Sequence, residues 1–393
     1  MKILLAHNYY RSSAPSGEDA VFRGERALLE GAGHEVIPFE RHNDDIDEST
    51  LRRRWVLALE GAWSRQSYDE IAALIGRHRP DVAHFHNTFP LISPSAYAAC
   101  QDNGVPVVQT LHNYRLICAN ALLLRDGKPC EACVGTSLLP ALRYRCYRGS
   151  LPATGAIVWM LARNRWHGTY RRLVDRYIAL TRFAAGRLVA GGLPVERMTV
   201  KPNFLDAPPA AAETRETFAI YVGRLSDEKG VRTLLRAWAT NRSLPLKILG
   251  DGPLRAELAN AAARQGLPIE LLGQRPKDEV LRLMRRAALQ IVPSECYEGF
   301  PMVILEAFAC GTPVVASNIG SLAEIVEHER TGLLFAPGDA EDLASKVQSL
   351  ANSPARLTYG HAARAVFEEK YTAERNLSML LDIYQQIQQE TTQ

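Results

Sequence analysis

The sequence predicts an α/β protein made of two doubly wound domains, and three observations support this fold class. Short apolar runs alternate with helical patterns along the chain, which indicates βαβ units and parallel sheets. The 393 residues exceed what one hydrophobic core usually holds, so two domains are expected. The segment VKPNFLDAPPAAAETRET (200–217), with three prolines and a run of alanines, has the composition of an inter-domain linker.

The short apolar runs give the strands in order. In the first domain they are predicted at MKILLA (1–6), HEVIPF (34–39), VAHFHN (82–87), VPVVQTLH (105–112) and DRYIALT (175–181). In the second domain they are predicted at FAIYVGR (218–224), LKILG (246–250), IELLG (269–273), LQIVPS (289–294), TPVVAS (312–317) and GLLFA (332–336). Helices are predicted at LLRAWATN (234–241), DEVLRLMRRAA (278–288) and 373–389. We therefore expect domains at 1–206 and 207–368, followed by a C-terminal helical segment, 369–393.

The composition is that of an ordinary globular protein, with 47% hydrophobic and 23% charged residues. The N-terminal MKILLAHNYY (1–10) has too short an apolar run for a signal peptide and is predicted as a strand. No stretch approaches the roughly 20 apolar residues of a membrane-spanning helix. We expect a cytoplasmic protein whose seven cysteines are reduced.

A basic segment lies in the first domain, where ten arginines and a single acid, Asp175, lie between Arg143 and Arg187. This excess fits a solvated helical face, and it also fits a surface for anionic lipid heads or a lipid-diphosphate acceptor. A lipid-binding surface would place the protein at the inner face of the membrane. Nucleic acid is disfavoured as a partner, because the pI is only about 8.4 and no nucleic-acid motif is present.

The loop after the first strand excludes one class of α/β enzyme. A dinucleotide-binding domain would carry G-x-G-x-x-G after its first strand, and neither 1–17 nor IYVGRLSDEKG (220–230) contains it. Ser16 and Asp19 instead form an S-x-x-D capping box at the start of a helix. Such a cap needs no function, but free N–H groups at a helix start also suit an anion, so Gly17 is a candidate ligand-binding residue.

Two glutamates, Glu298 and Glu306, are separated by seven residues in SECYEGFPMVILEAFACGTPVVAS (294–317). A helix is predicted over Pro301–Cys310, since proline suits the first turn and the following Gly311 suits the end. Glu306 then lies among apolar residues, where a carboxylate is costly to bury without partners. Ligand hydroxyl groups could satisfy it, but a surface glutamate on an amphipathic helix is an equal interpretation.

A pair of cations lies in IYVGRLSDEKG (220–230), with Arg224 at the end of a strand and Lys229 five residues further, before a helix. Two cations at such a turn can neutralise a diphosphate, because arginine supplies a fork of donors and lysine a point charge. By themselves they also fit an ordinary charged loop.

These features together resemble the retaining glycosyltransferases of family 4. In the second domain the matching segments are GRLSDEKG (223–230), LGDGPLRAEL (249–258), LLGQRPKDEV (271–280) and the run from ECYEGF to APGD (295–339). In the first domain HNYYRSSAPSGEDAVF (7–22), TLHNYRLICAN (110–120), DGKPCEAC (126–133) and CYRGS (146–150) are similar to a subset of bacterial polysaccharide-assembly enzymes. The resemblance implies the GT-B fold, in which two Rossmann-like domains face each other across a deep cleft and the C-terminal helix packs back on the first domain.

The resemblance also implies roles for individual residues. Glu306 would bind the ribose hydroxyls of a nucleotide-sugar donor, Glu298 would contact the donor sugar ring, and His112 would face the transferred sugar. Arg224 and Lys229 would hold the diphosphate. The candidate catalytic residues are therefore His112, Arg224, Lys229 and Glu298, and the other candidate donor-binding residues are Gly17, Gly223, Gly250, Arg275, Gly299, Phe300, Met302 and Val303.

The implied activity is metal-independent hexosyl transfer with retention of anomeric configuration, in which the departing phosphate takes the acceptor's proton. The protein would then supply positioning and charge stabilisation. A UDP-sugar is the favoured donor, a GDP-sugar is an alternative, and no further cofactor is expected. The acceptor would be a glycan or a lipid-diphosphate-linked glycan of a cell-surface polysaccharide. The alternatives are a GT-B sugar-nucleotide epimerase and a non-catalytic two-lobed sugar-binding protein.

Four cysteines of the first domain, Cys118, Cys130, Cys133 and Cys146, are spaced as C-x11-C-x2-C-x12-C. One C-x-x-C with two further thiols could close a tetrahedral structural zinc site. The spacing is not a standard two-knuckle pattern, so free thiols are an equal interpretation, and disulfides are disfavoured in the cytoplasm. A zinc ion held by four thiolates would have no part in catalysis.

Overall fold

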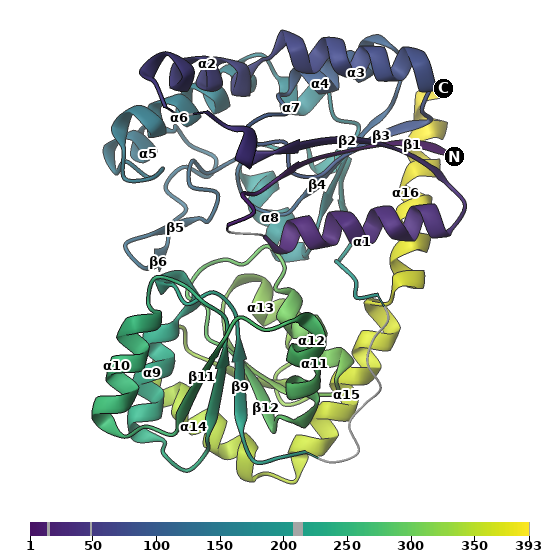
Figure 1. Cartoon of the computed structure of the whole chain (residues 1–393). Coiled ribbons are helices and arrows are strands. Elements are labelled where there is room, and N and C mark those ends of the chain that lie inside the picture. The colour runs from purple at the N-terminus through teal and green to yellow at the C-terminus, as the bar shows by residue number, and fades with distance from the viewer. Residues whose placement is uncertain (14–15, 48, 207–214, 393) are drawn as a thin grey trace. The chain divides into compact units, whose positions relative to one another are not determined.

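The computed structural model describes residues 1–13, 16–47, 49–206 and 215–392, and its chain divides into two compact units (Figure 1). The first unit comprises Met1–Leu122, Glu131–Pro202 and the C-terminal residues from Asn376 onward. The second unit comprises Leu123–Cys130 and Asn203–Arg375. Each unit is built on a six-stranded sheet in which all neighbouring strands are parallel, so the chain is of the predicted α/β class.

The first unit's sheet has the strand order β2-β1-β3-β4-β7-β8. The strands are β1 (Lys2–Tyr9), β2 (Glu35–His42), β3 (Val82–Phe85), β4 (Val107–Leu111), β7 (Arg176–Ala179) and β8 (Met198–Val200). The chain adds β2 on one side of β1 and then returns to the other side with β3. This reversal creates a switch point between β1 and β3, where doubly wound sheets usually bind ligands.

The helices of the first unit connect these strands. They are α1 (Gly17–Gly31), α2 (Leu51–Ala62), α3 (Arg65–His78), α4 (Ser95–Asp102), α5 (Leu139–Arg143), α6 (Leu151–Trp166), α7 (Thr169–Arg172) and α8 (Arg182–Ala190), with short 3₁₀ turns η1 (Asn43–Asp45) and η2 (Val195–Arg197). The predicted capping box at the start of α1 is confirmed: Glu18 N–H donates to Ser16 Oγ, and Ser16 N–H donates to an Asp19 oxygen.

The last helix, α16 (Ala373–Thr392), contributes to the core of the first unit. Its apolar residues recur at helical spacing, which gives one buried stripe. The stripe consists of Leu380, Ile383, Tyr384 and Ile387, and it packs against Ile3, Val82, Val108 and Ile178 from four strands of the sheet.

The second unit's sheet has the order β11-β10-β9-β12-β13-β14. The strands are β9 (Ala219–Val222), β10 (Leu246–Leu249), β11 (Ile269–Gly273), β12 (Leu289–Val292), β13 (Val314–Ser317) and β14 (Gly332–Phe335). The connecting elements are η3 (Asp227–Lys229), α9 (Val231–Thr240), α10 (Arg255–Gln265), α11 (Lys277–Arg286), α12 (Met302–Ala309), α13 (Gly320–Ile325), α14 (Ala340–Asn352) and α15 (Ala355–Lys370).

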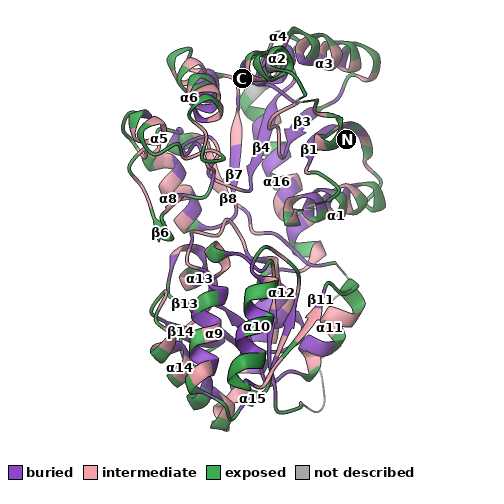
Figure 2. Cartoon of the chain, turned by 60° about the vertical axis from the view of Figure 1, so that its left-hand side comes forward, coloured by how far each residue is buried: buried purple, intermediate pink, exposed green. Residues whose placement is uncertain are grey.

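Both faces of this second sheet are covered. Successive β9 residues point into different cores, because Ile220 packs with α12 and α15 whereas Tyr221 packs with α9 and α14. Parallel strands buried on both faces read as continuous apolar runs, which is why the sequence showed them so clearly. Figure 2 shows the central strands of both sheets as buried, whereas the edge strand β11 is largely intermediate.

All eleven strands predicted above are confirmed, together with the helices at 234–241, 278–288 and 373–389. The sequence analysis did not identify β8 or the hairpin of β5 (Leu124–Arg125) and β6 (Lys128–Pro129), which have only three and two residues per strand. The predicted linker lies partly outside the described residues, because 207–214 are not among them. No helix in the described ranges is both long enough and apolar enough to cross a bilayer.

Candidate functional site

The loops at the carboxyl edge of the second unit's sheet carry most of the candidate donor-binding residues. The strand order reverses at β9, because β10 and β11 extend the sheet on one side of it and β12 starts the other side. Ligands of doubly wound sheets bind at such a switch point. The loop after β9 contains Arg224 and Lys229, and the loop after β12 contains Glu298, so these residues leave the sheet at the switch point.

Lys229 and Glu298 join the two loops as an ion pair. Lys229 Nζ donates to Glu298 Oε1 over 2.6 Å, and Ser294 Oγ donates to the same oxygen over 2.6 Å. Burial raises the pKa of Glu298, but the charge of Lys229 and these hydrogen bonds outweigh burial and leave the pKa below its ordinary value. Burial lowers the pKa of Lys229, and the charge of Glu298 more than reverses this. Both groups are therefore ionised at neutral pH.

Glu306 lies on α12, half-buried, and its carboxylate has no hydrogen bond or ion pair with any residue that the structure describes. Burial raises its pKa, and the charge of Lys277 opposes burial only in part. A carboxylate that is desolvated without a partner costs free energy, which a ligand hydroxyl can recover. The half-buried position does not fit the alternative interpretation of a fully solvated surface glutamate.

The helix that carries Glu306 is confirmed within one residue of each predicted end. Pro301 is the N-cap of α12, Cys310 is the C-cap, and Gly311 follows with φ +65°. The first N–H groups of a helix have no partner within it. Those of Met302 and Val303 are therefore open to an anion, and Gly299 and Phe300 lie half-buried beside them.

At two positions glycine is required by packing, whether or not the residue also contacts a ligand. A Cβ on Gly250, where φ is +132°, would lie 1.9 Å from the carbonyl oxygen of Gly223. A Cβ on Gly230, where φ is +68°, would lie 1.8 Å from the carbonyl oxygen of Pro293. Close backbone approach therefore requires glycine at both positions.

The remaining candidate cations of the second unit are on its surface. Arg224 is exposed, and so is Arg275, whose nearest acid is Glu279 at 3.9 Å. Exposed arginines are available to a ligand, but their position alone assigns no contact.

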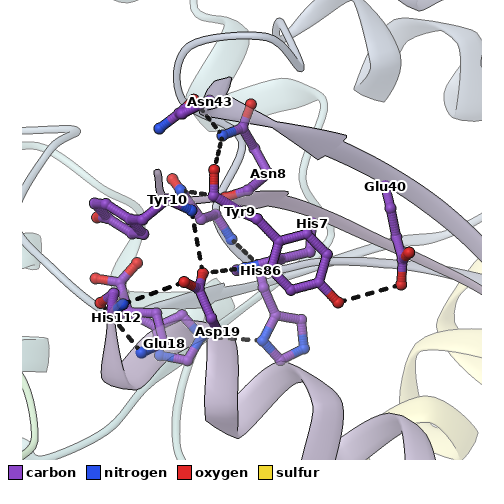
Figure 3. A network of polar contacts seen from close by, with 12 residues as sticks. His7, Asn8, Tyr9, Tyr10, Glu18, Asp19, Glu40, Asn43, His86 and His112 are labelled. Atoms are coloured by element: carbon purple, nitrogen blue, oxygen red, sulfur yellow. Dashed lines mark hydrogen bonds and ion pairs between the residues drawn. The ribbon is translucent and has the colours of Figure 1, made fainter. Parts of the chain in front are cut away.

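The first unit has a pocket at the carboxyl edge of its own sheet, with about 330 Å³ of empty space when the open solvent at its mouth is included. Its lining includes Glu18, His86, Gln109, His112 and Arg115. Glu18 Oε1 accepts a hydrogen bond from Asn113 Nδ2 at 2.9 Å, and the hydroxyl of Tyr10 also interacts with this carboxylate. Burial raises the pKa of Glu18 to about 7. Figure 3 shows Glu18, His86 and His112 close together beside the start of α1.

A buried charged cluster lies behind this pocket. Glu25 from α1 accepts hydrogen bonds from His86 Nε2 at 2.9 Å and from Lys201 Nζ at 3.0 Å. Burial alone would raise the pKa of Glu25, but the charge of Lys201 and the hydrogen bond from His86 hold it well below its ordinary value. His86 Nδ1 lies 3.0 Å from His112 Nε2, so the cluster continues directly to His112.

Among the described residues, only Glu25, His84 and His86 form a group of three or more ligand atoms close enough to hold a metal. Their ligand atoms are already engaged. Both ring nitrogens of His84 lie within hydrogen-bonding distance of hydroxyl groups, at 2.7 Å from Tyr384 and 2.8 Å from Thr110. Lys201 occupies the free side of Glu25, so the cluster is an ionic network rather than a metal site.

His112 therefore lies in the first unit, and Arg224, Lys229, Glu298 and Glu306 lie in the second. Gly17 begins α1 in the first unit, and the other candidate donor-binding residues are in the second. The sequence analysis missed Glu25, His86 and Lys201. A signal was available for His86, because VAHFHN ends a predicted strand with two histidines at the edge where ligands bind.

The four clustered cysteines are not gathered into a metal-sized group in the described part of the chain. All seven cysteines are thiols. Cys118 is buried, and its Sγ lies 2.9 Å from Asn120 Oδ1, whereas Cys130, Cys133 and Cys146 are half-buried. Nothing in this arrangement supports the zinc site.

The arginines between Arg143 and Arg187 do not form one uniform basic face. Arg176 and Arg187 each pair with an acid from outside the segment, Glu390 and Glu131, over 2.6 Å. Arg165 donates to main-chain carbonyls of the first unit. Part of the charge excess is therefore used within the fold.

Two family models match the chain, one over each half. Residues 26–207 match the model described as Glycosyltransferase Family 4, and residues 206–366 match the model described as Glycosyl transferases group 1.

Curated relatives match over part of the chain. An uncharacterized glycosyltransferase of Methanocaldococcus jannaschii is 34% identical over 43% of this chain and 48% of its own length. The amylovoran biosynthesis glycosyltransferase AmsK of Erwinia amylovora is 29% identical over 52% of this chain and 55% of its own length. The chain thus spans about half the length of these relatives.

Among solved structures, HepE of Anabaena has been determined in complex with UDP and with UDP-glucose. It superimposes with a TM-score of 0.66 at 19% identity, over 98% of this chain and all of that one. At this identity the likeness supports a shared fold and no more.

Proposed function

Since this chain belongs to glycosyltransferase family 4, with the GT-B fold, we propose that it transfers a sugar from a nucleotide-diphosphate donor to a glycan acceptor. The observation that carries the proposal is the arrangement at the second unit's switch point. There Glu306 lies half-buried on α12 without a partner among the described residues, and Glu298, in the loop before α12, pairs with Lys229 from the loop after β9.

Each group of this arrangement fits one part of a nucleotide sugar. The carboxylate of Glu306 can accept hydrogen bonds from two ribose hydroxyls. Lys229, Arg224 and the first N–H groups of α12 are donors suited to a diphosphate. Glu298 is held by Lys229 and is suited to a sugar hydroxyl. We favour a UDP-sugar because HepE binds UDP and UDP-glucose, with a GDP-sugar as the alternative.

The reaction we propose proceeds with retention of configuration and without a metal. Negative charge grows on the leaving diphosphate as the glycosidic bond to it breaks. Lys229 and Arg224 supply the positive charge that stabilises this change, a role that a divalent cation has in other transferases. The acceptor hydroxyl loses its proton to the departing phosphate, and the protein positions both groups.

The acceptor we propose is a growing cell-surface polysaccharide, free or lipid-linked. Support comes from AmsK, an amylovoran biosynthesis glycosyltransferase, and from the motifs of the first half that resemble polysaccharide-assembly enzymes. The reaction would take place in the cytoplasm, at the inner face of the membrane when the acceptor is lipid-linked.

The test is a calorimetric titration of the full chain with UDP, GDP and their sugars, followed by measurement of nucleotide release with candidate acceptors. We expect micromolar binding of one nucleotide and release that depends on acceptor. Interconversion of the donor sugar without an acceptor would identify an epimerase. Binding of sugars but of no nucleotide diphosphate would identify a sugar-binding protein and refute the proposal.

We also propose that the first unit contacts an anionic membrane, through a surface formed by α2, α5 and α6, which pack together. Figure 2 shows exposed faces on α2 and α6. Most of the large apolar side chains exposed in the described residues belong to these helices or directly follow them: Trp55, Val56, Leu59, Trp63, Leu139, Tyr144, Leu151, Trp159 and Trp166. Trp55 and Leu59 share one face of α2, because they are four residues apart, and Trp63 directly follows the helix.

This surface combines the two features of an interfacial membrane site. Tryptophan and leucine side chains insert between lipid heads, and arginines attract anionic lipids. The guanidinium of Arg163 lies over the ring of Trp63 at 4.9 Å. Arg143 ends α5, and Arg148 follows it by five residues. Some arginines of the segment already pair with acids within the fold. The remaining charge alone would bind lipid weakly, so the apolar side chains are needed.

Sedimentation with anionic phosphatidylglycerol vesicles tests this surface. Leu59 and Leu357 are exposed to the same degree, 53% and 55%, on helices of different units. We expect Leu59→Ser to weaken vesicle binding and Leu357→Ser to leave it unchanged. Binding should also fall as salt rises. No binding at low salt, or equal loss in both variants, would refute a membrane surface and leave a protein partner or a solvated face.

A further inference from the structure

A chain of three side chains connects the buried core of the first unit to its pocket. Glu25 Oε1 lies 2.9 Å from His86 Nε2, and His86 Nδ1 lies 3.0 Å from His112 Nε2. The rings of His86 and His112 are stacked, with centroids 5.2 Å apart. These residues come from α1 and from the ends of β3 and β4, so the fold brings together positions up to 87 residues apart.

The charges of the cluster decide which atom donates each hydrogen bond. Glu25 is ionised, so its oxygen can only accept, and His86 Nε2 must carry the proton. Lys201 Nζ already balances the charge of Glu25 at 3.0 Å, and a second cation buried here would have no counter-charge. His86 is therefore neutral, and its Nδ1 is an acceptor. His112 Nε2 must then donate to it.

This direction fixes the tautomer of His112. A neutral imidazole carries one proton, so with Nε2 protonated its Nδ1 is an acceptor. Burial keeps the pKa of His112 well below its ordinary value, which agrees with a neutral ring. Nδ1 has no hydrogen-bond partner among the described residues, and His112 lines the pocket.

The pocket has further acceptors. Gln109 Oε1 is buried without a hydrogen bond, and the ionised form of Glu18 adds a carboxylate; both residues line the same pocket as His112. A ligand that satisfies such a site must bring hydrogen-bond donors, and the hydroxyl groups of a sugar are donors of the required kind.

We propose that Glu25 and His86 are positioning residues that hold His112 in the tautomer whose Nδ1 accepts a hydrogen bond from a sugar hydroxyl in this pocket. The sugar part of the proposal rests on the proposed function, whereas the tautomer does not. Lys201 and Asn376 support the chain from the far side: Lys201 Nζ also donates to Asn376 Oδ1 at 3.0 Å, and Asn376 Nδ2 donates to the carbonyl of Pro202 at 2.8 Å. The hydroxyl could belong to the donor sugar or to the acceptor glycan.

The tautomer is measured directly by long-range ¹H–¹⁵N correlation spectra of the full chain with ¹⁵N-labelled histidine. A His112→Asn variant assigns the resonances. We expect a protonated Nε2 and an unprotonated Nδ1 for His112 at neutral pH. A His112 ring protonated at Nδ1 in the unaltered protein would overturn the proposal, whatever its activity.

Two substitutions of His86 separate its two contacts. The amide of asparagine takes the place of Nδ1, so His86→Asn keeps an acceptor for His112 and loses Glu25. The amide of glutamine takes the place of Nε2, so His86→Gln keeps Glu25 and loses His112. We expect the His112 tautomer to become mixed in His86→Gln, which no longer contacts His112. It should be retained better in His86→Asn, whose amide oxygen can still accept from His112 Nε2 although Glu25 no longer orients it. Thermal unfolding would confirm that His86→Gln is folded. If its His112 tautomer were then unchanged, His86 would not determine the tautomer of His112.

Kinetics then identify the sugar. Loss of one hydrogen bond should lower kcat/KM in His86→Gln by about tenfold relative to His86→Asn. A change in KM for the nucleotide sugar, with KM for the acceptor unchanged, would assign the hydroxyl to the donor, and the reverse would assign it to the acceptor. Equal kinetics in the two variants would refute the sugar contact. If no glycosyl transfer is found at all, the proposed function fails, but the NMR result still tests the tautomer.

Discussion

Lys229 Nζ and Glu298 Oε1 lie 2.6 Å apart and tie together the loops that leave β9 and β12. The pair holds a cation at the switch point of the sheet with its charge already partly satisfied. A diphosphate must therefore compete with Glu298 for Lys229. If a ligand hydroxyl donates a hydrogen bond to Glu298, the carboxylate can give up its contact with Lys229. The residues around this pair lead to separate expectations for affinity, turnover and stability.

The first prediction concerns Glu306. Glu306→Gln should weaken UDP binding by roughly 1–3 kcal/mol, or about 5- to 150-fold, because the amide accepts fewer hydrogen bonds from the ribose. The same change should leave the free energy of unfolding equal or higher, since it removes an unpaired, partly desolvated charge. Calorimetry and urea denaturation measure the two quantities. Glu369→Gln, on the exposed side of α15, is the control.

An opposite result for Glu306 would be informative. If Glu306→Gln bound UDP as well as the unaltered protein, the residue would have no part in nucleotide recognition. Lower stability in the variant would mean that the carboxylate has a partner within the fold.

The second prediction concerns Lys229. Lys229→Met should lower kcat more than it weakens binding of uridine, because the leaving-group charge grows in the transition state and uridine carries none. It should also reduce stability, since Glu298 is left with Ser294 alone. Adding Glu298→Gln should restore stability without restoring turnover. Steady-state kinetics at saturating donor and denaturation of the single and double variants test this. Unaltered kcat in Lys229→Met would show that Lys229 is only a structural partner of Glu298.

Much of the fold could be predicted because its strands are parallel and buried on both faces. AIYV (219–222) consists of hydrophobic residues throughout, and VVAS (314–317) does so up to its final serine, so both strands can be recognised in the sequence. The three-residue β8 and the β5–β6 hairpin are too short to produce such a pattern.

The site of the second unit could be predicted from the sequence because each of its residues lies either in a loop that follows a strand or on the helix after that loop. The first unit's cluster was not, because it depends on contacts distant in sequence: Glu25 meets Lys201 across 176 positions and His84 meets Tyr384 across 300. A histidine at a strand end is visible in a sequence, whereas the partner that fixes its tautomer is not.

The third prediction concerns the thiols. The structure does not gather Cys118, Cys130, Cys133 and Cys146, so the zinc hypothesis depends on measurement. Elemental analysis of the purified chain decides it. One zinc per chain, with Cys133→Ser losing both the metal and stability, would establish a structural site. Without zinc, we expect the half-buried Cys130 to react with a thiol reagent in the native state and the buried Cys100 to resist, since burial raises the pKa of Cys100.

The last prediction concerns Glu18 and pH. Burial raises the pKa of Glu18 to about 7, above the ordinary value near 4.5 that it has in the unfolded chain. A raised folded pKa means that the folded protein binds the proton more tightly than the unfolded chain does. This contribution to stability is complete below pH 4.5 and is lost as the pH rises through 7.

The free energy of unfolding should therefore fall by roughly 1–3 kcal/mol between pH 5 and pH 8 through Glu18 alone. Glu18→Gln should remove that part of the pH dependence, because its amide does not titrate. Glu30→Gln, at an exposed position of the same helix α1, should leave it in place. Urea denaturation of the three proteins at both pH values measures the difference. A Glu18→Gln protein that loses as much stability as the unaltered chain over this range would show that the Glu18 carboxylate is solvated when the protein is folded.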